Sequence, residues 1–447
     1  MPQPNDFTPA TNLAQAYNAV NPDLALHPGD SRYGDFSEWR GDEHIRMVAR
    51  RITRADQAQP VQHLKQLVTG HRGCGKTTEL LRLKAHLEEE GYFVVYFNSA
   101  LELDMNDVDY TDILLTTMYQ LARQVNTSDL KLKLREKQVE NLRGRLGQII
   151  KEEESLLEVE SSIEAEIGTG FAVPFLKVLA VIKSKIKNNA TQKETIRTEI
   201  KQRIPQFLED LNDLINNLQT QLSDLGKQGL VIIIDSLDRI IPHALDEERR
   251  RTRHTEIFIE HAEHLKAPRC HIVYTVPISI HFNENLSTVY TDKTVTIPMI
   301  KVRHEDASEC KGGLEAIYQS IEKRINIDAV FENPADVNRL ALASGGHIRD
   351  LMHLVRYACD YSDEQITTDA VDRAIRALTR EYDRLVKDRD LPRLVKVHRE
   401  RRLPTDPEYA LLPYHLIVLE YQNAERWADV HPAVQATRKF KKALEDA

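Results

Sequence analysis

The fold is decided by the stretch Gly70-His71-Arg72-Gly73-Cys74-Gly75-Lys76-Thr77-Thr78. It fits the pattern G-x-x-x-x-G-K-[ST] and lies between a short apolar segment, residues 67–69, and leucines at helical spacing. In such a loop, glycines let backbone N–H groups point inward around phosphate oxygens. We expect Lys76 to add a positive charge to those oxygens and the Thr77 hydroxyl to bind Mg²⁺. The alternative is a glycine-rich turn that binds no phosphate, and the flanking strand and helix disfavour it.

A second motif, VIIIDSLDR at residues 231–239, begins as an apolar strand and ends in carboxylates. We expect Asp235 to hold Mg²⁺ through water, because a carboxylate that ends a buried strand is costly unless it meets a cation. Asp238 lies three residues further on and is the candidate that orients the attacking water. For Asp238 the alternative is an exposed or helix-capping aspartate.

Apolar runs at 93–97, 230–235 and 271–276 are rich in β-branched and aromatic residues and are separated by helical periodicity. This pattern predicts an α/β fold in which helices cover a parallel sheet. A further run, residues 294–298, is expected at the edge of the sheet, because Pro298 cannot donate a ladder hydrogen bond.

The predicted domains are an N-terminal arm (1–35), a core (36–303), a helical lid (304–386) and a small winged-helix-like C-terminal domain (387–447). The arm is expected to dock on the next domain or to stay mobile. Within the core, residues 126–226 carry leucines and isoleucines at steps of three, four and seven. They are expected to form a helical hairpin that projects from the core.

These motifs resemble those of the P-loop ATPases of the AAA+ and STAND groups, over residues 36–380 without the insertion. The resemblance rests on the loop GHRGCGKTT, the strand VIIIDSLDR and the lid segment SGGHIRDL at 344–351. It implies binding and hydrolysis of ATP with Mg²⁺. It also implies that Thr275 is the polar first sensor and that Arg349 reaches the γ-phosphate from the lid. The alternative for Arg349 is a surface position on a helix.

The resemblance has two departures. Residues 278–293, where ring ATPases of this kind usually carry an arginine finger, contain no arginine. The arginines at 249–253 are candidates for that role in a neighbouring copy, although a solvated charge run is the commoner explanation. The second acid is Asp238 and not the glutamate frequent in ring translocases. Both departures favour a slow nucleotide-dependent switch over a fast motor.

The resemblance extends to prokaryotic regulatory ATPases, including those of antiviral defence, which assemble with and control a separate effector. No nuclease, protease or deaminase signature stands in this chain, so we expect an effector protein and self-association. The alternative is a DNA-associated AAA+ ATPase of the initiator or transposition-regulator kind. A third hypothesis is a non-catalytic scaffold stabilised by nucleotide.

Composition limits the remaining choices. The chain has 447 residues with 60 Lys+Arg against 69 Asp+Glu, a net charge of −9, which excludes a nucleic-acid-coating protein. Two stretches are locally basic, residues 174–203 and 380–402, and the second is the candidate DNA contact. The four cysteines lie far apart, which indicates a reducing, cytoplasmic setting. Neither a membrane span nor a histidine pair with metal-ligand spacing is seen, so Mg²⁺ is the only metal expected.

Overall fold

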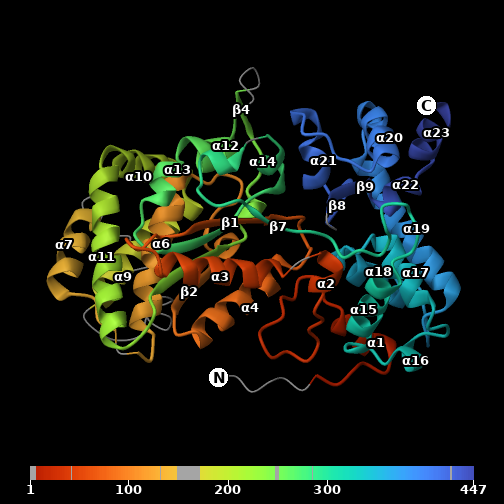
Figure 1. The fold of residues 1–447 in the computed structure, drawn as a ribbon, viewed down its shortest axis with the longest axis horizontal. Helices are drawn as coiled ribbons and strands as arrows, with labels where there is room; N and C mark the ends of the chain where they lie inside the picture. The colour runs from red at the N-terminus through yellow and green to blue at the C-terminus, as the bar shows by residue number, and fades with distance from the viewer. Residues whose placement is uncertain are drawn as a thin grey trace.

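The computed structural model describes residues 7–41, 43–130, 132–147, 172–246, 251–283, 285–422 and 425–447. A five-stranded parallel sheet in the order β2-β3-β6-β1-β7 lies at its centre (Figure 1). The strands are β1 (Lys65–Gly70), β2 (Phe93–Asn98), β3 (Leu230–Asp235), β6 (His271–Thr275) and β7 (Val295–Ile297). The predicted α/β fold is confirmed, and β7, which ends just before Pro298, is an edge strand as predicted.

The strand order brings the two sequence motifs to one edge of the sheet. Strand β6 lies between β1, which leads into the glycine-rich loop, and β3, which ends at Asp235. The register places Val68 beside Thr275, and Asn98 beside Asp235. Because all five strands are parallel, the residues that follow their carboxyl ends meet at the same edge.

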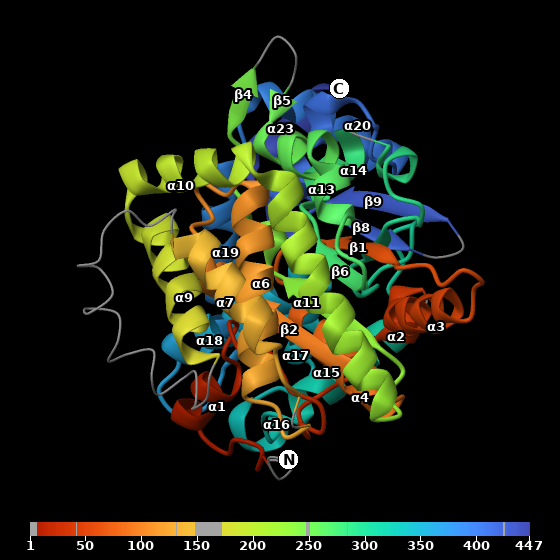
Figure 2. The same cartoon turned by 90° about the vertical axis from the view of Figure 1, so that its left-hand side faces the viewer.

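Helices cover both faces of the sheet, which explains why residues 231–234 are entirely buried. On one face lie α3 (His44–Asp56) and α4 (Lys76–Glu89), whose apolar stripes pack on Val68, Val94 and Val231. The other face is covered by α6 (Tyr110–Asn126), α11 (Ile204–Asp224) and α13 (Ala262–Lys266) (Figure 2). Shorter elements of this part are α2 (Ser37–Arg40), α5 (Ser99–Glu102), β4 (Ala244–Asp246), β5 (Arg251–Thr252), α12 (Arg253–Thr255) and α14 (Ile278–Asn283).

The predicted projecting hairpin at residues 126–226 is wrong for the part that the structure describes. That part forms α7 (Glu136–Gly147), α9 (Val173–Asn188), α10 (Ala190–Gln202) and α11; residues 148–171 lie outside the described residues. The helices share one apolar cluster with α6 and the sheet, in which Leu179 and Leu218 join Ile232. The hydrophobic stripes therefore face the sheet and α6, as well as each other.

The lid consists of α15 (Lys311–Glu322), α16 (Ile327–Val330), α17 (Asp336–Ser344), α18 (Ile348–Asp360) and α19 (Thr368–Leu385). The N-terminal arm docks on it: α1 (Leu13–Ala19) packs against α18, and the Ala10 N–H donates to the Arg324 carbonyl at 2.9 Å. Further along, the arm reaches the core, where the Leu26 N–H donates to Thr78 Oγ1 at 3.2 Å.

The C-terminal domain contains α20 (Leu391–Glu400), α21 (Leu411–Tyr414), the antiparallel pair β8 (Val418–Gln422) and β9 (Arg426–Val430), α22 (Pro432–Gln435) and α23 (Arg438–Asp446). Most of its apolar residues share one cluster with the lid beside the sheet domain (Figure 1), whereas Leu419, Tyr421 and Trp427 join the cluster around the core sheet. Strand β8 also contacts the core, because the Met299 N–H donates to the Glu420 carbonyl at 3.0 Å. None of the described helices is long and apolar enough to cross a bilayer.

Candidate nucleotide-binding site

The glycine-rich loop joins β1 to α4 in a conformation that requires glycine. Gly73 and Gly75 have φ of 82° and 100°, in the left-handed region that other residues rarely adopt. A Cβ atom on Gly73 would lie 2.6 Å from His347 Nε2 and 2.7 Å from Arg349 Cβ. The first turn of α18 therefore lies directly against the tip of the loop.

Lys76, the first residue of α4, is held in place before any phosphate arrives. Its ammonium donates to the carbonyls of Gly70 and His71, each at 2.8 Å, and pairs with Asp238 Oδ2 at 2.9 Å. Burial opposes the charged ammonium, but the acidic groups around it, Asp238 foremost, together outweigh burial, and the pKa of Lys76 is raised. The two residues predicted for phosphate binding and water orientation thus form a buried ion pair.

Thr77 and Asp235, the predicted metal ligands, come from α4 and β3 and are joined by a hydrogen bond from the threonine side chain to the carboxylate. Asp235 also accepts from Tyr96 Oη at 2.8 Å and from the Ser236 N–H at 2.6 Å. Burial, and then the neighbouring Asp238, raise its pKa. A hydroxyl beside a carboxylate is the oxygen-donor set that Mg²⁺ prefers, so the residues present fit this ion.

Thr275, the predicted first sensor, ends β6 at the correct edge of the sheet but does not face the cavity. Its hydroxyl accepts from the Leu237 N–H at 2.9 Å and donates to the Ile234 carbonyl at 3.3 Å. Both partners belong to β3 and to the turn that follows it. Thr275 therefore holds the segment that carries Asp235 and Asp238.

A cavity lies over the loop, between the core and the lid. Its lining includes the loop itself, the arm around residues 21–26, the turn at 236–239 and the start of α18. Arg349 enters it from α18, with Nη2 3.6 Å from Asp23 Oδ1 and with its buried Nε lacking a hydrogen-bond partner. Burial, and then the nearby Arg239, lower the pKa of Arg349. Several guanidinium groups thus converge on one space, an arrangement that favours an anion.

Further residues of this cavity carried no sequence signal. Arg40 of α2 donates to the Cys74 carbonyl and pairs with Glu79 at 3.4 Å, so it supports the loop from behind. Arg324 of the lid also lines the cavity, and burial lowers its pKa to about 10. No motif joins these arginines to the loop, because they lie on separate elements and meet it only in the folded chain.

His71 links the loop to the C-terminal domain. Its Nδ1 donates to the Pro413 carbonyl at 3.0 Å, and its Nε2 accepts from the Glu420 N–H at 2.9 Å. Burial lowers the pKa of His71 to about 3, so the ring stays neutral at physiological pH. His71 therefore connects the glycine-rich loop directly to the C-terminal domain, on either side of the start of β8.

Ion pairs within the chain neutralise most of the first basic stretch and part of the second. Between 174 and 203, Lys193 pairs with Asp104 and Asp107, and Arg197 pairs with Asp112 at 2.5 Å. This corrects the expectation of a basic surface there. In the 380–402 stretch, the predicted DNA contact, Arg401 pairs with Asp429 and Arg393 with Asp390 and Glu408.

Of the proposed trans-acting arginines, residues 249 and 250 lie outside the described part of the chain. Arg251 and Arg253 form ion pairs with Glu256. Neither lines the cavity over the loop.

Comparison with known proteins places the loop and the β3 motif in one domain: residues 57–255 match the KAP family P-loop domain. The fold of the chain is that of a P-loop NTPase. A search of curated proteins found no match. Among solved structures, the P-loop NTPase is similar to ORC2 from Aeropyrum pernix, solved as ADPNP–ADP complexes, with a TM-score of 0.42, 12% identity and 96% of both chains covered.

Two further solved structures resemble the P-loop NTPase at a similar level. A Walker-type ATPase of Pyrococcus abyssi has a TM-score of 0.39 and 13% identity, with 96% of this chain and 99% of that one covered. A point mutant of RuvB from Thermotoga maritima has a TM-score of 0.33 and 12% identity, with 93% and 98% covered.

Proposed function

We propose that this P-loop NTPase binds and hydrolyses ATP as a molecular switch. The observation that carries the proposal is the position of the cavity, which has Lys76 on the core side and the partly unpaired Arg349 on the lid side. A triphosphate in this space would touch both, so its presence would set how the lid lies on the core. The preference for adenine rests on the resemblance to AAA+ and STAND proteins.

The Lys76–Asp238 pair supplies the first step. An arriving phosphate competes for Lys76, because a phosphate oxygen and Asp238 Oδ2 seek the same ammonium. Binding would release the Asp238 carboxylate, which then accepts a hydrogen bond from the water that attacks the γ-phosphate. Mg²⁺, held by Thr77 and Asp235, would neutralise charge on the phosphates.

The lid supplies the output of the switch. Arg349 now pairs with Asp23 of the arm at 3.6 Å, a distance that leaves most of its hydrogen-bonding capacity unused. A γ-phosphate would draw Arg349 toward the loop, and its loss on hydrolysis would release it. Because the C-terminal domain shares most of its apolar core with the lid and packs on the sheet domain through β8 and β9, movement of the lid would change its contact with the core.

We further propose that this movement controls self-association and a partner effector protein, and that the system serves prokaryotic antiviral defence. Both proposals rest on the resemblance of the motifs to regulatory ATPases of that kind. Recovering the chain from its native host with its associated proteins and nucleic acid tests them directly. A chain recovered alone, with and without ATP, would contradict effector control.

The decisive test of the switch is phosphate release from Mg²⁺-ATP. We expect Lys76→Ala to lose ATP binding and Asp238→Ala to bind ATP but to release phosphate at least about 100-fold more slowly, the usual range for a lost general base. Lys84→Ala, on the same helix but paired with Glu88 and remote from the loop, is the matched control and should resemble wild type.

Size analysis with ATP and with ADP accompanies these assays. Equal phosphate release by wild type and Lys76→Ala would show that the site is wrong. Tight ATP binding by wild type without any phosphate release would instead identify a nucleotide-stabilised scaffold and overturn the proposal of hydrolysis.

A further inference from the structure

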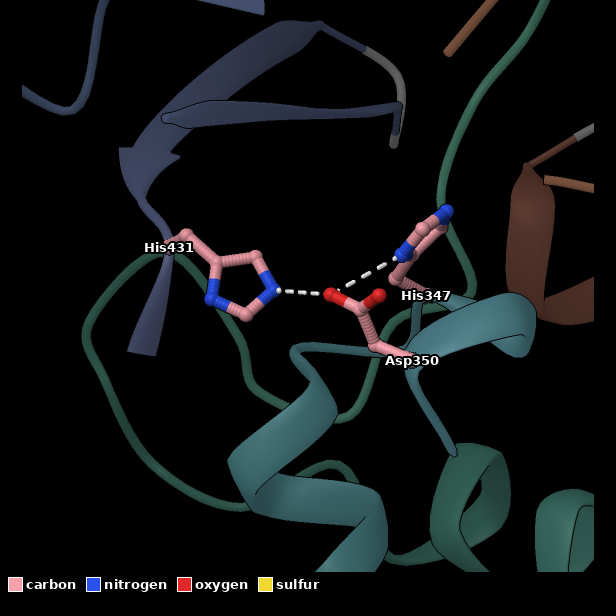
Figure 3. A group of neighbouring side chains, drawn as sticks. All are labelled: His347, Asp350 and His431. Atoms are coloured by element: carbon pink, nitrogen blue, oxygen red, sulfur yellow. Dashed lines mark ion pairs between the residues drawn. The ribbon is translucent and has the colours of Figure 1, made fainter. Parts of the chain in front are cut away.

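Three buried side chains outside the nucleotide cavity converge where the lid meets the C-terminal domain. His347 and Asp350 belong to the start of α18, and His431 follows β9 (Figure 3). One ligand atom from each lies within 4.8 Å of the other two. His347 Nδ1 and His431 Nε2 each lie 3.1 Å from the same oxygen, Asp350 Oδ2. Both nitrogens are buried, and neither has a hydrogen bond of acceptable geometry.

The outer nitrogen of the His347 ring meets a backbone carbonyl. His347 Nε2 lies 2.7 Å from the Arg72 carbonyl, an atom that only accepts, so this nitrogen carries a proton. The Ser344 carbonyl also hydrogen-bonds to the His431 ring. With that proton in place, the inner nitrogen of a neutral His347 ring directs its lone pair at the Asp350 carboxylate oxygen. Such an arrangement is repulsive unless a cation lies between them.

We propose that His347, Asp350 and His431 bind a divalent transition-metal ion of the Zn²⁺ type. Ligands about 2.0–2.1 Å from a tetrahedral zinc ion are roughly 3.3 Å apart, close to the 3.1 Å separations seen here. Two imidazoles and one carboxylate favour zinc over Mg²⁺, which prefers oxygen ligands. Metal-bound histidines also typically donate their outer N–H to a carbonyl, as His347 does. The fourth position would be taken by water.

A cluster without metal is the competing arrangement. The hydrogen bond from the Ala433 N–H to His431 Nδ1, at 3.0 Å, fits this arrangement, because it leaves the ring proton on Nε2, where it donates to Asp350. Tyr382 adds a hydrogen bond to Asp350 Oδ2 at 2.6 Å, and its ring stacks on His431. The cluster would then be held together by protons. The two arrangements differ in metal content, which can be measured directly.

The test uses untagged full-length protein, incubated with Zn²⁺ without nucleotide and dialysed against metal-free buffer. We expect about one zinc per chain by elemental analysis, and a visible absorption spectrum of four-coordinate Co²⁺ when cobalt replaces zinc. His431→Gln and His347→Gln should lose the zinc, and chelation should lower the melting temperature of wild type alone. Wild-type protein that retains no zinc would overturn the proposal, whether or not the variants fold.

Two control variants distinguish zinc bound at this site from zinc bound elsewhere on the protein. His398→Gln removes a histidine of the same domain that pairs with Asp429 at 2.7 Å and lies outside the cluster. Asp235→Asn alters the predicted Mg²⁺ position. Both should retain one zinc. Loss of zinc in Asp235→Asn, with retention in His431→Gln, would place the ion in the nucleotide site and contradict the proposal.

Discussion

At the scale of single residues, the site depends on close contacts between the glycine-rich loop and the lid. Gly73 is the point of closest approach, because its missing side chain leaves room for the His347 ring. The loop can therefore hold its phosphate-binding shape and touch α18 at the same time. A side chain at position 73 would disturb either the conformation of the loop or its contact with α18.

Gly73→Ala is therefore expected to lower both stability and nucleotide affinity. The left-handed conformation alone costs a non-glycine residue about 1–2 kcal/mol, and the clash with His347 adds to this. Thermal unfolding and ATP titration measure the two effects. Gly144→Ala is the control: its added Cβ has free space in helix α7, so it should be neutral or stabilising. A Gly73→Ala protein as stable as wild type would refute the loop–lid contact.

Which site residues were predictable depends on how they are spread along the chain. Lys76, Thr77, Asp235 and Asp238 stand in two contiguous motifs, because each motif must form a loop or turn of fixed geometry after one strand. Arg40 and His431 carry no such signal. The contact of His431 with Asp350 arises only when the C-terminal domain packs on the lid. No spacing of histidines along the chain indicates this cluster, because its residues come from two separate elements.

At the scale of elements, hydrophobic periodicity predicted the strands and the helices around them. It did not predict where the helices of residues 126–226 pack. A stripe of leucines indicates that a helix buries one face, but it does not indicate which surface covers that face. In the described residues that surface is α6 and the sheet. The prediction of a basic surface at residues 174–203 is wrong for the same reason. Arg197 was expected on that surface, but Asp112 pairs with it in the folded chain.

Arg197→Met tests whether α10 is an integral part of the core. Removing the guanidinium would leave Asp112 buried and unpaired, at a cost of about 3–5 kcal/mol. We expect this loss in urea unfolding, within a single cooperative transition. The exposed Thr198→Met on the same helix should change stability by less than about 0.5 kcal/mol. An equally small change in Arg197→Met would show that the helix is attached loosely.

At the scale of the whole molecule, the nucleotide cavity lies between two units, the sheet domain and the joined lid and C-terminal domain. Only a ligand long enough to reach from Lys76 to Arg349 would hold both units. This arrangement predicts different responses to ATP and ADP.

Arg349→Gln is expected to weaken ATP binding by about 10- to 100-fold and to leave ADP binding unchanged, because a hydrogen bond between charged groups contributes about 1.5–3 kcal/mol. Calorimetric titration with ADP and with a slowly hydrolysed ATP analogue measures this ratio. Arg356→Gln is the matched control, since Arg356 lies on the same helix but stacks on Tyr17 of the arm. Equal losses for both nucleotides would assign Arg349 to another role.

The contacts of His71 have a consequence for regulation. Through Pro413 and Glu420, the C-terminal domain touches the loop that holds the phosphates. By thermodynamic reciprocity, a partner bound to that domain must change ATP affinity by the same factor by which ATP changes affinity for the partner. The C-terminal domain is thus expected to regulate nucleotide binding as well as to respond to it.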